Sequence, residues 1–208
     1  MNTIWVSLII FVNLVIYAAW NFKLADFVTP QFLLESFTVS YQGLMEGRYW
    51  TLLTAAFSHS FLIHFIFNML VIHSFGRVLE LTLGAKKFLS LYFIAAVFSS
   101  LTHAFVSAHF LHQPAQSALG ASGAASGVIL LFSLLYPKER ILLFGIVPIP
   151  ALVGALLFIG LDVWGLFAQA GGGGLPIGHG AHLGGALIGI LFYFFTPKRK
   201  VPETYYSA

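Results

Sequence analysis

Residues 120–127 read Gly-Ala-Ser-Gly-Ala-Ala-Ser-Gly, a run of small residues with two hydroxyl groups that opens a long apolar segment. A second small-residue stretch, residues 181–185, reads Ala-His-Leu-Gly-Gly and opens the last apolar segment. A serine nucleophile needs a base such as histidine within hydrogen-bonding reach. If folding brings the two stretches together, Ser122 and His182 supply such a pair.

Both segments also repeat glycine at a spacing of four, as Gly123 and Gly127 in one and as Gly185 and Gly189 in the other. This spacing lets two membrane helices approach closely, although on its own it usually indicates only packing. Here it occurs in both helices that carry the candidate pair. We therefore expect these two helices to lie in direct contact.

The composition is that of a membrane protein, because 59% of the residues are hydrophobic and only 8% are charged. The few Lys and Arg residues are too scattered to form a nucleic-acid-binding surface. The chain has no cysteine, which excludes disulfides, thiolate metal sites and a cysteine nucleophile. Any covalent catalysis must therefore use another residue.

Six apolar segments are long enough to cross about 30 Å of hydrocarbon, which takes about 20 helical residues. The first lacks the basic start and the cleavage site of a signal peptide, so we expect it to be retained. The predicted fold is an all-α membrane protein with one domain over residues 1–208. The predicted spans are 3–20, 60–82, 87–108, 119–136, 141–168 and 180–196.

Basic residues gather on one side of this predicted topology, and the positive-inside rule makes that side cytoplasmic. Both termini would then be cytoplasmic in a multi-pass protein, for which we expect a bacterial cell (inner) membrane. The residues on that side are Lys86, Lys87, Lys138, Arg140, Lys198, Arg199 and Lys200. On the other side, Lys23 and Arg48 are balanced by Asp26, Glu35 and Glu46.

Two connections on the predicted outside stand out. Residues 21–58 are too broken by proline, glycine and glutamate to span, yet too apolar to float in water, so we expect them to lie in the membrane interface. Residues 171–174 are four consecutive glycines, which fit either a moving lid or a plain flexible loop.

Polar residues from three spans fall in one outer layer of the predicted bundle. Ser122 lies about one turn below the outer end of the fourth span, and His182 lies near the outer end of the sixth. His64 and Asn68 are four residues apart, on one face of the second span near its outer end. The layer is therefore a candidate site that opens to the outside.

With these motifs the chain resembles a rhomboid intramembrane serine protease over essentially all six spans. The matching motifs are His64-x-x-x-Asn68, Gly120-x-Ser122-Gly123 and Ala181-His182-x-x-Gly185, in the family's order. The resemblance implies a six-transmembrane-helix rhomboid bundle with Ser122 as nucleophile and His182 as base and later acid. It also implies that His64, Asn68 and the Ser122 backbone N–H stabilise the oxyanion.

The resemblance further implies what this site would act on. The substrates would be single-span membrane proteins, which enter laterally from the lipid bilayer between spans two and five and are cut near their outer end. No metal or organic cofactor and no nucleic acid is implied, and the oligomeric state stays open. Glu80 resembles a family position with a structural role near the cytoplasmic end.

Two departures from the family pattern concern the surroundings of the site. Thr51 follows Trp50 where many rhomboids have arginine, which affects the bonding inside the first outside loop. Ser126 stands where some members place an aromatic residue against the histidine, so the packing that orients His182 is open. We favour a packing role for Ser126.

Other polar and aromatic residues admit more than one interpretation. Asp162 is either the third member of a triad or a contact to a loop or water, and we favour the latter because the resemblance implies a dyad. Phe158, Trp164 and Phe167 fit lipid-facing or packing positions, or a gate for substrate. The remaining histidines are too scattered over loops and depths to predict a metal site; they are His59, His73, His103, His109, His112 and His179.

Two other classes of function stay open. A non-catalytic rhomboid-like protein would bind and escort membrane clients, but such relatives typically lack the serine or the histidine. A small transporter would use intramembrane histidines, but the chain has no evident inverted repeat or midplane pair of broken helices.

Overall fold

A computed structural model describes residues 3–22, 25, 28–143 and 146–197 of the chain. The described part is mostly helical, as predicted. Lys23, Asp26 and Lys198 to Lys200, which entered the topology prediction, lie outside the described residues. The long helices are α1 (Ile4–Asn21), α7 (Ala85–His109), α8 (Ser122–Leu135), α9 (Ala151–Ala170) and α10 (His179–Phe194).

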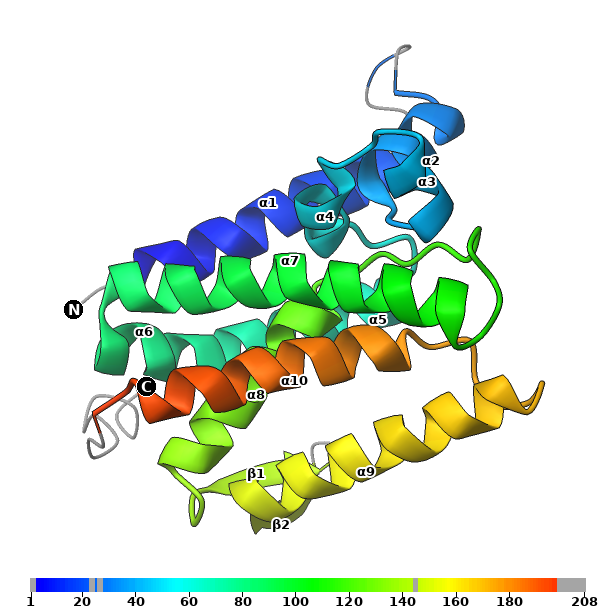
Figure 1. The fold of residues 1–208 in the computed structure, drawn as a ribbon. Coiled ribbons are helices and arrows are strands. Elements are labelled where there is room, and N and C mark those ends of the chain that lie inside the picture. Colours follow the sequence, from blue (N-terminus) through cyan, green and yellow to red (C-terminus); the bar gives the residue numbers. More distant parts are fainter. Residues whose placement is uncertain (1–2, 23–24, 26–27, 144–145, 198–208) are drawn as a thin grey trace.

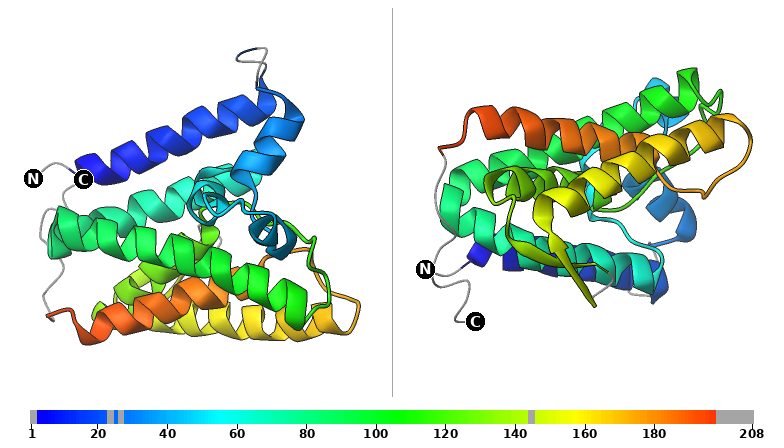
Figure 2. Two further views of the ribbon diagram at one scale, coloured as in Figure 1. Left: turned by 45° about the horizontal axis from the view of Figure 1, so that its top comes forward. Right: turned by 90° about the horizontal axis from the view of Figure 1, so that it is seen from below.

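The second predicted span is one helical rod in three parts, namely α5 (Leu62–Val71), the π-helical turn η2 (Ile72–Gly76) and α6 (Arg77–Leu83). Figures 1 and 2 show α1 and α9 at opposite margins of the bundle, with α7, α8 and α10 between them. The bundle therefore encloses α8 and α10, the two helices that carry the candidate pair.

Among the described residues, four helices are long and apolar enough to cross a membrane: α1, the rod 62–83, α7 and α9. The helices α8 and α10 have 14 and 16 residues, which at 1.5 Å per residue makes them about 21 and 24 Å long. Both match predicted spans in position but fall short of a full crossing. Six complete crossings therefore stay a prediction.

The fourth span does not begin where the sequence predicted. Residues 119–121 precede the helix, and Ser122 is its first residue rather than a residue one turn inside it. Ten of the 14 residues of α8 are buried. A helix enclosed by neighbours need not match the thickness of the bilayer, so α8 can be shorter than a full crossing.

The prediction of a fifth span from residue 141 was wrong over its first ten residues. Strands β1 (Arg140–Leu143) and β2 (Val147–Pro150) pair antiparallel there, with Ile141 opposite Ile149, and α9 begins only at Ala151. Pro148 and Pro150 explain the difference. Proline lacks a backbone N–H and disfavours helical conformation in the residue before it, so the helix starts after the second proline.

The connection that was predicted to lie outside forms short helices over residues 30–57. These are α2 (Pro30–Phe37), α3 (Tyr41–Met45), α4 (Thr51–Thr54) and the 3₁₀ turn η1 (Ala55–Phe57). Its internal bonding is maintained around Thr51, whose side chain donates to the Arg48 carbonyl at 2.6 Å. The Arg48 guanidinium in turn pairs with Glu46 at 2.6 Å. The loop is therefore closed without an arginine at position 51.

Glycines bring α8 and α10 into backbone contact, as their spacing predicted. A β-carbon on Gly185 would collide with the carbonyl of Gly123, and one on Gly189 would lie 2.5 Å from the carbonyl oxygen of Gly127. On its other side α10 meets α7, where a β-carbon on Gly184 would collide with Thr102. These contacts hold α10 tightly between α7 and α8.

Candidate active site

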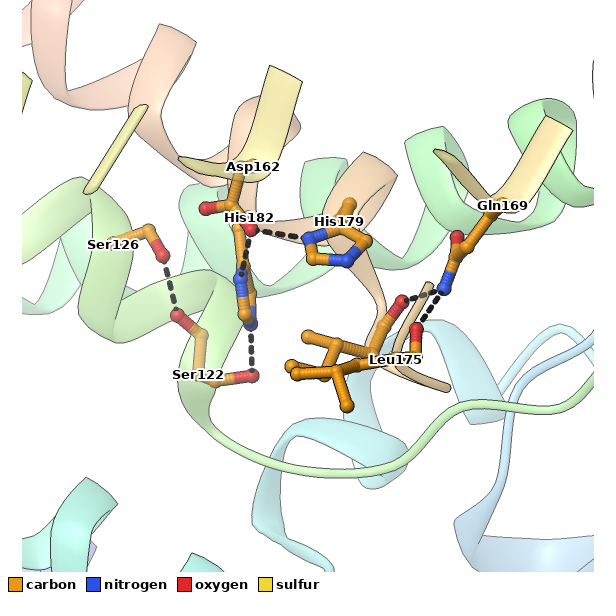
Figure 3. Close-up of polar contacts among 8 residues, drawn as sticks. Ser122, Ser126, Asp162, Gln169, Leu175, His179 and His182 are labelled. Carbon is orange, nitrogen blue, oxygen red and sulfur yellow. Dashed lines mark hydrogen bonds and ion pairs between the residues drawn. The ribbon is translucent and has the colours of Figure 1, made fainter. Parts of the chain in front are cut away.

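The structure brings together Ser122 and His182, which are 60 residues apart in sequence. Ser122 Oγ lies 2.9 Å from His182 Nε2, within hydrogen-bonding distance (Figure 3). The serine is the first residue of α8, and the histidine lies in the first turn of α10. The glycine contact between these helices sets the short distance, because bulkier residues would push the backbones apart.

His182 has a second partner, Asp162, which the sequence interpretation named only as the less favoured alternative. Its Nδ1 lies 2.9 Å from Asp162 Oδ1, and the same oxygen lies 2.7 Å from His179 Nδ1. All three side chains are buried. The interpretation of Asp162 as a loop or water contact was therefore wrong. The apolar pattern of α9 does not fix which side of that helix faces α10, so this contact could not be read from sequence.

The ring of Phe158 supplies the aromatic surface that position 126 lacks. It packs against His182 with ring centroids 5.4 Å apart and planes tilted by 30°. Ser126 instead donates its hydroxyl to the carbonyl of Ser122 at 2.7 Å, in line with the packing role predicted for it. Thus α9 contributes both a ring and a carboxylate to the surroundings of His182.

His64 and Asn68 line the same cavity as Ser122 and His182. Gly120, at φ +126°, passes so close to the His64 ring that a β-carbon there would lie 2.5 Å from its Cε1. Asn68 Nδ2 donates to the His64 carbonyl at 2.8 Å. An amide nitrogen has two hydrogens, so one remains for another acceptor.

His59 is a residue of the site region that sequence reasoning grouped with the scattered histidines. It is fully buried, and its Nε2 accepts a hydrogen bond from the backbone N–H of Ala121 at 3.3 Å. Burial, with a smaller effect of the nearby His64, lowers the pKa of His59 to about 3. His59 therefore stays neutral at physiological pH and holds the loop that leads into Ser122. No motif in the sequence indicated this role.

The start of α8 offers hydrogen-bond donors beside Ser122. No side chain of the described residues caps this helix start, and the first N–H groups of any helix lack acceptors within the helix. The partial positive charge of a helix N-terminus also favours a negative group there. A developing oxyanion beside Ser122 would be stabilised by these N–H donors and by the partial positive charge.

A cavity of about 630 Å³ connects these groups. Its lining is largely apolar and includes residues from α5, α7, α8, α9 and α10 and from the loop before Ser122. A half-buried hydroxyl paired with an imidazole, next to free helix N–H groups, is the arrangement that acyl transfer to serine requires.

One group of described residues has the composition of a metal site. The ligand atoms of Asp162, His179 and His182 all lie within 4.8 Å of one another. The expectation that His179 is scattered with the other histidines was therefore wrong. The same three side chains already hydrogen-bond one another, so a cation there would compete with the contact that His182 makes to Asp162.

The glycine loop between α9 and α10 is attached to α9 by one side chain. Gln169 Nε2 donates to the carbonyls of Leu175 at 2.6 Å and Ile177 at 2.8 Å (Figure 3). Gly172 and Gly174 both have a φ of +81°, a backbone conformation that favours glycine. Whether the loop moves as a lid stays a prediction.

The chain is similar to known proteins that have rhomboid in their names. Residues 46–199 match the rhomboid domain family. The chain is 32% identical to RHOMBOID-like protein 12, mitochondrial, of Arabidopsis thaliana over 188 residues, which are 85% of this chain and 55% of that protein. It is 33% identical to Rhomboid protein 1, mitochondrial, of Saccharomyces cerevisiae over 192 residues, 90% of this chain and 51% of the relative. The chain thus spans about half the length of these relatives.

Proposed function

The chain belongs to the rhomboid family, and from this premise we propose that it is an intramembrane serine endopeptidase that cuts transmembrane-helix substrates near their outer end. The observation that carries the proposal is the 2.9 Å contact between Ser122 Oγ and His182 Nε2 inside a largely apolar cavity. In a buried site, this pairing is what a serine nucleophile and its base need.

In the proposed reaction, the two ring nitrogens of His182 have different partners, Asp162 at Nδ1 and Ser122 at Nε2. Nε2 takes the proton of Ser122 while Oγ forms a bond to the substrate carbonyl carbon, which gives a tetrahedral oxyanion. The oxyanion collapses, the peptide C–N bond breaks, and the proton on Nε2 passes to the leaving amine. A water molecule then repeats the sequence on the acyl-enzyme, which releases the acid and restores Ser122.

Donors for the oxyanion come from two helices in this proposal. The backbone N–H of Ser122 lies at the start of α8, and His64 and the free hydrogen of the Asn68 amide face the same cavity from α5. Removing one such donor typically costs about 3 kcal/mol in the transition state. The donors are fixed before the reaction, so charge develops where it is already stabilised.

Substrate would reach the site from the lipid, between α5 and α9 of a six-span bundle. Phe67 of α5 and Phe158 of α9 both line the cavity, and these two helices carry many exposed apolar side chains. An intact helix hides its carbonyls in backbone hydrogen bonds, so the substrate must unwind before Ser122 can attack. Small or helix-breaking residues near the cut would lower the cost of unwinding.

A membrane location follows from the composition and the long apolar helices, whereas the sidedness belongs to the proposal. We propose that the chain lies in a bacterial inner membrane with both termini in the cytoplasm. The relatives above have mitochondrial names, so an organellar membrane is the alternative location. The chain has no cysteine, so single variants Lys86→Cys and Gly173→Cys can be labelled with an impermeant maleimide on intact cells. Labelling at 173 alone supports the proposed sidedness, and labelling at 86 alone reverses it.

The proposed activity is tested with a fluorophosphonate probe on detergent-solubilised protein. We expect labelling of the wild type and its loss in Ser122→Ala and His182→Ala. Ser133→Ala is the matched control, because Ser133 is a fully buried hydroxyl on the same helix whose Oγ has no partner among the described residues. Equal labelling in all four proteins, or none in folded wild type, would favour the non-catalytic client-binding alternative.

A further inference from the structure

Asp162 is a buried carboxylate in the apolar helix α9, and two histidines of α10 share one of its oxygens. Oδ1 accepts from His179 Nδ1 at 2.7 Å and from His182 Nδ1 at 2.9 Å, while Oδ2 has no partner among the described residues. Charged groups are costly inside a membrane protein, and where they occur they usually serve function.

The contact decides which nitrogen of His182 carries the proton. A neutral imidazole has one N–H, so when Nδ1–H donates to Asp162, Nε2 is left as the acceptor that faces Ser122. The opposite tautomer would place an N–H against the serine hydroxyl and could not take its proton. The partner of one ring nitrogen therefore sets the chemistry of the other.

His179 keeps the carboxylate in place. It lies in the first turn of α10, and its buried ring fits against Gly165 of α9, where a β-carbon would collide with it. The missing side chain at Gly165 lets the ring reach Oδ1 of Asp162, one turn earlier on the same helix. His182, in turn, is held from α9 by both Asp162 and the Phe158 ring.

We propose that Asp162, held by His179, is a positioning residue that fixes His182 with Nδ1 protonated and Nε2 directed at Ser122. The inference rests on the proposed function. During attack, Nε2 gains the serine proton and the imidazolium keeps its Nδ1–H on the carboxylate. Asp162 keeps accepting this hydrogen bond and takes no proton, so it stabilises the imidazolium. The proton later leaves from Nε2 to the amine.

Because Asp162 and Phe158 both belong to α9, the position of this helix becomes part of the active geometry. If α9 moves away from α10, His182 loses its carboxylate and its ring contact together. The proposed entry of substrate beside α9 would then have to preserve the outer part of the contact between α9 and α10. The activity of the site therefore depends on the position of α9 against α10.

The test combines kinetics with a direct view of the tautomer. Wild type, Asp162→Asn, Asp162→Ala and His179→Gln are compared for kcat and KM on a transmembrane substrate and for the fluorophosphonate labelling rate. Nitrogen-15 histidine spectra in micelles, with the His182 signals assigned by loss in His182→Ala, report which ring nitrogen is protonated. Leu161→Ala is the control, because Leu161 is an exposed apolar side chain of α9 that does not line the cavity.

We expect kcat and the labelling rate to fall about 10²- to 10⁴-fold in both Asp162 variants, with KM little changed, as for a histidine that loses its orienting carboxylate. In His179→Gln we expect a smaller decrease in kcat and in the labelling rate, by about tenfold. In Asp162→Ala the His182 spectrum changes from the Nδ1-protonated form to a mixture. Leu161→Ala keeps the wild-type tautomer and kcat.

Wild-type kcat and tautomer in folded Asp162→Ala would overturn the inference while leaving the proposed function standing, provided that Ser122→Ala is inactive. If the wild type itself shows no activity, the proposed function fails instead. The spectra still decide in that case, since an unchanged His182 tautomer in Asp162→Ala contradicts the positioning role and a mixture supports it.

Discussion

Glu80 accepts a hydrogen bond from the backbone N–H of Val6 at 2.9 Å, and its other oxygen accepts one from Trp5 at 3.2 Å. The carboxylate of α6 thus binds the first turn of α1, where helix N–H groups lack partners and a negative charge is favoured. This is a structural role, as the sequence predicted for Glu80. It fixes the first helix at the margin of the bundle, remote from Ser122.

We therefore expect Glu80→Ala to destabilise the fold without changing the chemistry. Hydrogen bonds to a charged group contribute about 1.5–3 kcal/mol each, so the loss should lower the midpoint of thermal unfolding clearly. Light-scattering or fluorescence melts in detergent measure it. Glu35→Ala, an exposed carboxylate on α2, is the control and should melt like the wild type. An unchanged midpoint in Glu80→Ala would show that the Glu80 hydrogen bonds do not contribute to holding α1.

The backbone contact between α8 and α10 predicts a strong effect of a single methyl group. Gly185→Ala places a β-carbon against the Gly123 carbonyl, so the helices must separate and Ser122 moves away from His182. We expect loss of probe labelling, with reduced yield of folded protein. Gly160→Ala on α9 meets nothing within 4 Å and should be neutral or slightly stabilising, because alanine favours helix over glycine by about 1 kcal/mol.

The buried His59 predicts a pH dependence of stability. Its pKa in the folded protein is about 3, against an ordinary histidine pKa of 6.5, so the unfolded chain binds more protons between these pH values. Stability is therefore complete above about pH 6.5 and falls as the pH decreases. At pH 5 the loss from this group is roughly 2 kcal/mol, at 1.36 kcal/mol per pH unit.

His59→Gln isolates that contribution, because an amide oxygen can still accept from the Ala121 N–H but does not titrate over this range. We expect the decrease in unfolding midpoint between pH 7 and 5 to be smaller in this variant than in the wild type. His109→Gln, a histidine at the end of α7 outside the cavity, serves as the comparison. Parallel curves for wild type and His59→Gln would contradict the assignment.

The sequence predicted the meeting of Ser122 and His182 because both lie beside glycine pairs, and glycine pairs constrain how two helices pack. It did not predict the partner of His182 Nδ1, because α9 is apolar on most sides and its rotation about its own axis leaves no periodic signal. The ring of Phe158 was missed as the substitute for position 126 for the same reason.

Local chemistry explains the remaining differences between sequence and structure. Mean hydropathy cannot separate an apolar hairpin from a helix, so residues 141–150 were joined to the fifth span although Pro148 and Pro150 were visible. The length of α8 was overestimated because a buried helix and a spanning helix have the same composition. Both errors concern where a segment begins, whereas the helical class of the fold was correct.

The Phe158 ring predicts a measurable contribution to the orientation of His182. Phe158→Ala removes the face against which the imidazole packs at 5.4 Å, so we expect the labelling rate to fall by about tenfold, the effect of roughly 1.4 kcal/mol from a lost ring contact. Leu161→Ala, an exposed apolar position on the same helix, should leave the rate unchanged. Equal rates in the two variants would mean that Asp162 alone orients the histidine.

Substitution of Asn68 can distinguish a role in oxyanion binding from a role in local structure. Its Nδ2 bonds the carbonyl four residues earlier, and Asn13 Nδ2 makes the same bond to Ile9 at 2.8 Å on α1. Asn13→Ala therefore removes an equivalent local bond outside the cavity lining. If Asn68 also binds the oxyanion, Asn68→Ala lowers kcat about 10²- to 10³-fold with KM nearly unchanged, whereas Asn13→Ala affects only stability. A decrease in kcat no larger than that in Asn13→Ala would assign Asn68 a structural role and leave His64 and the start of α8 as the oxyanion donors.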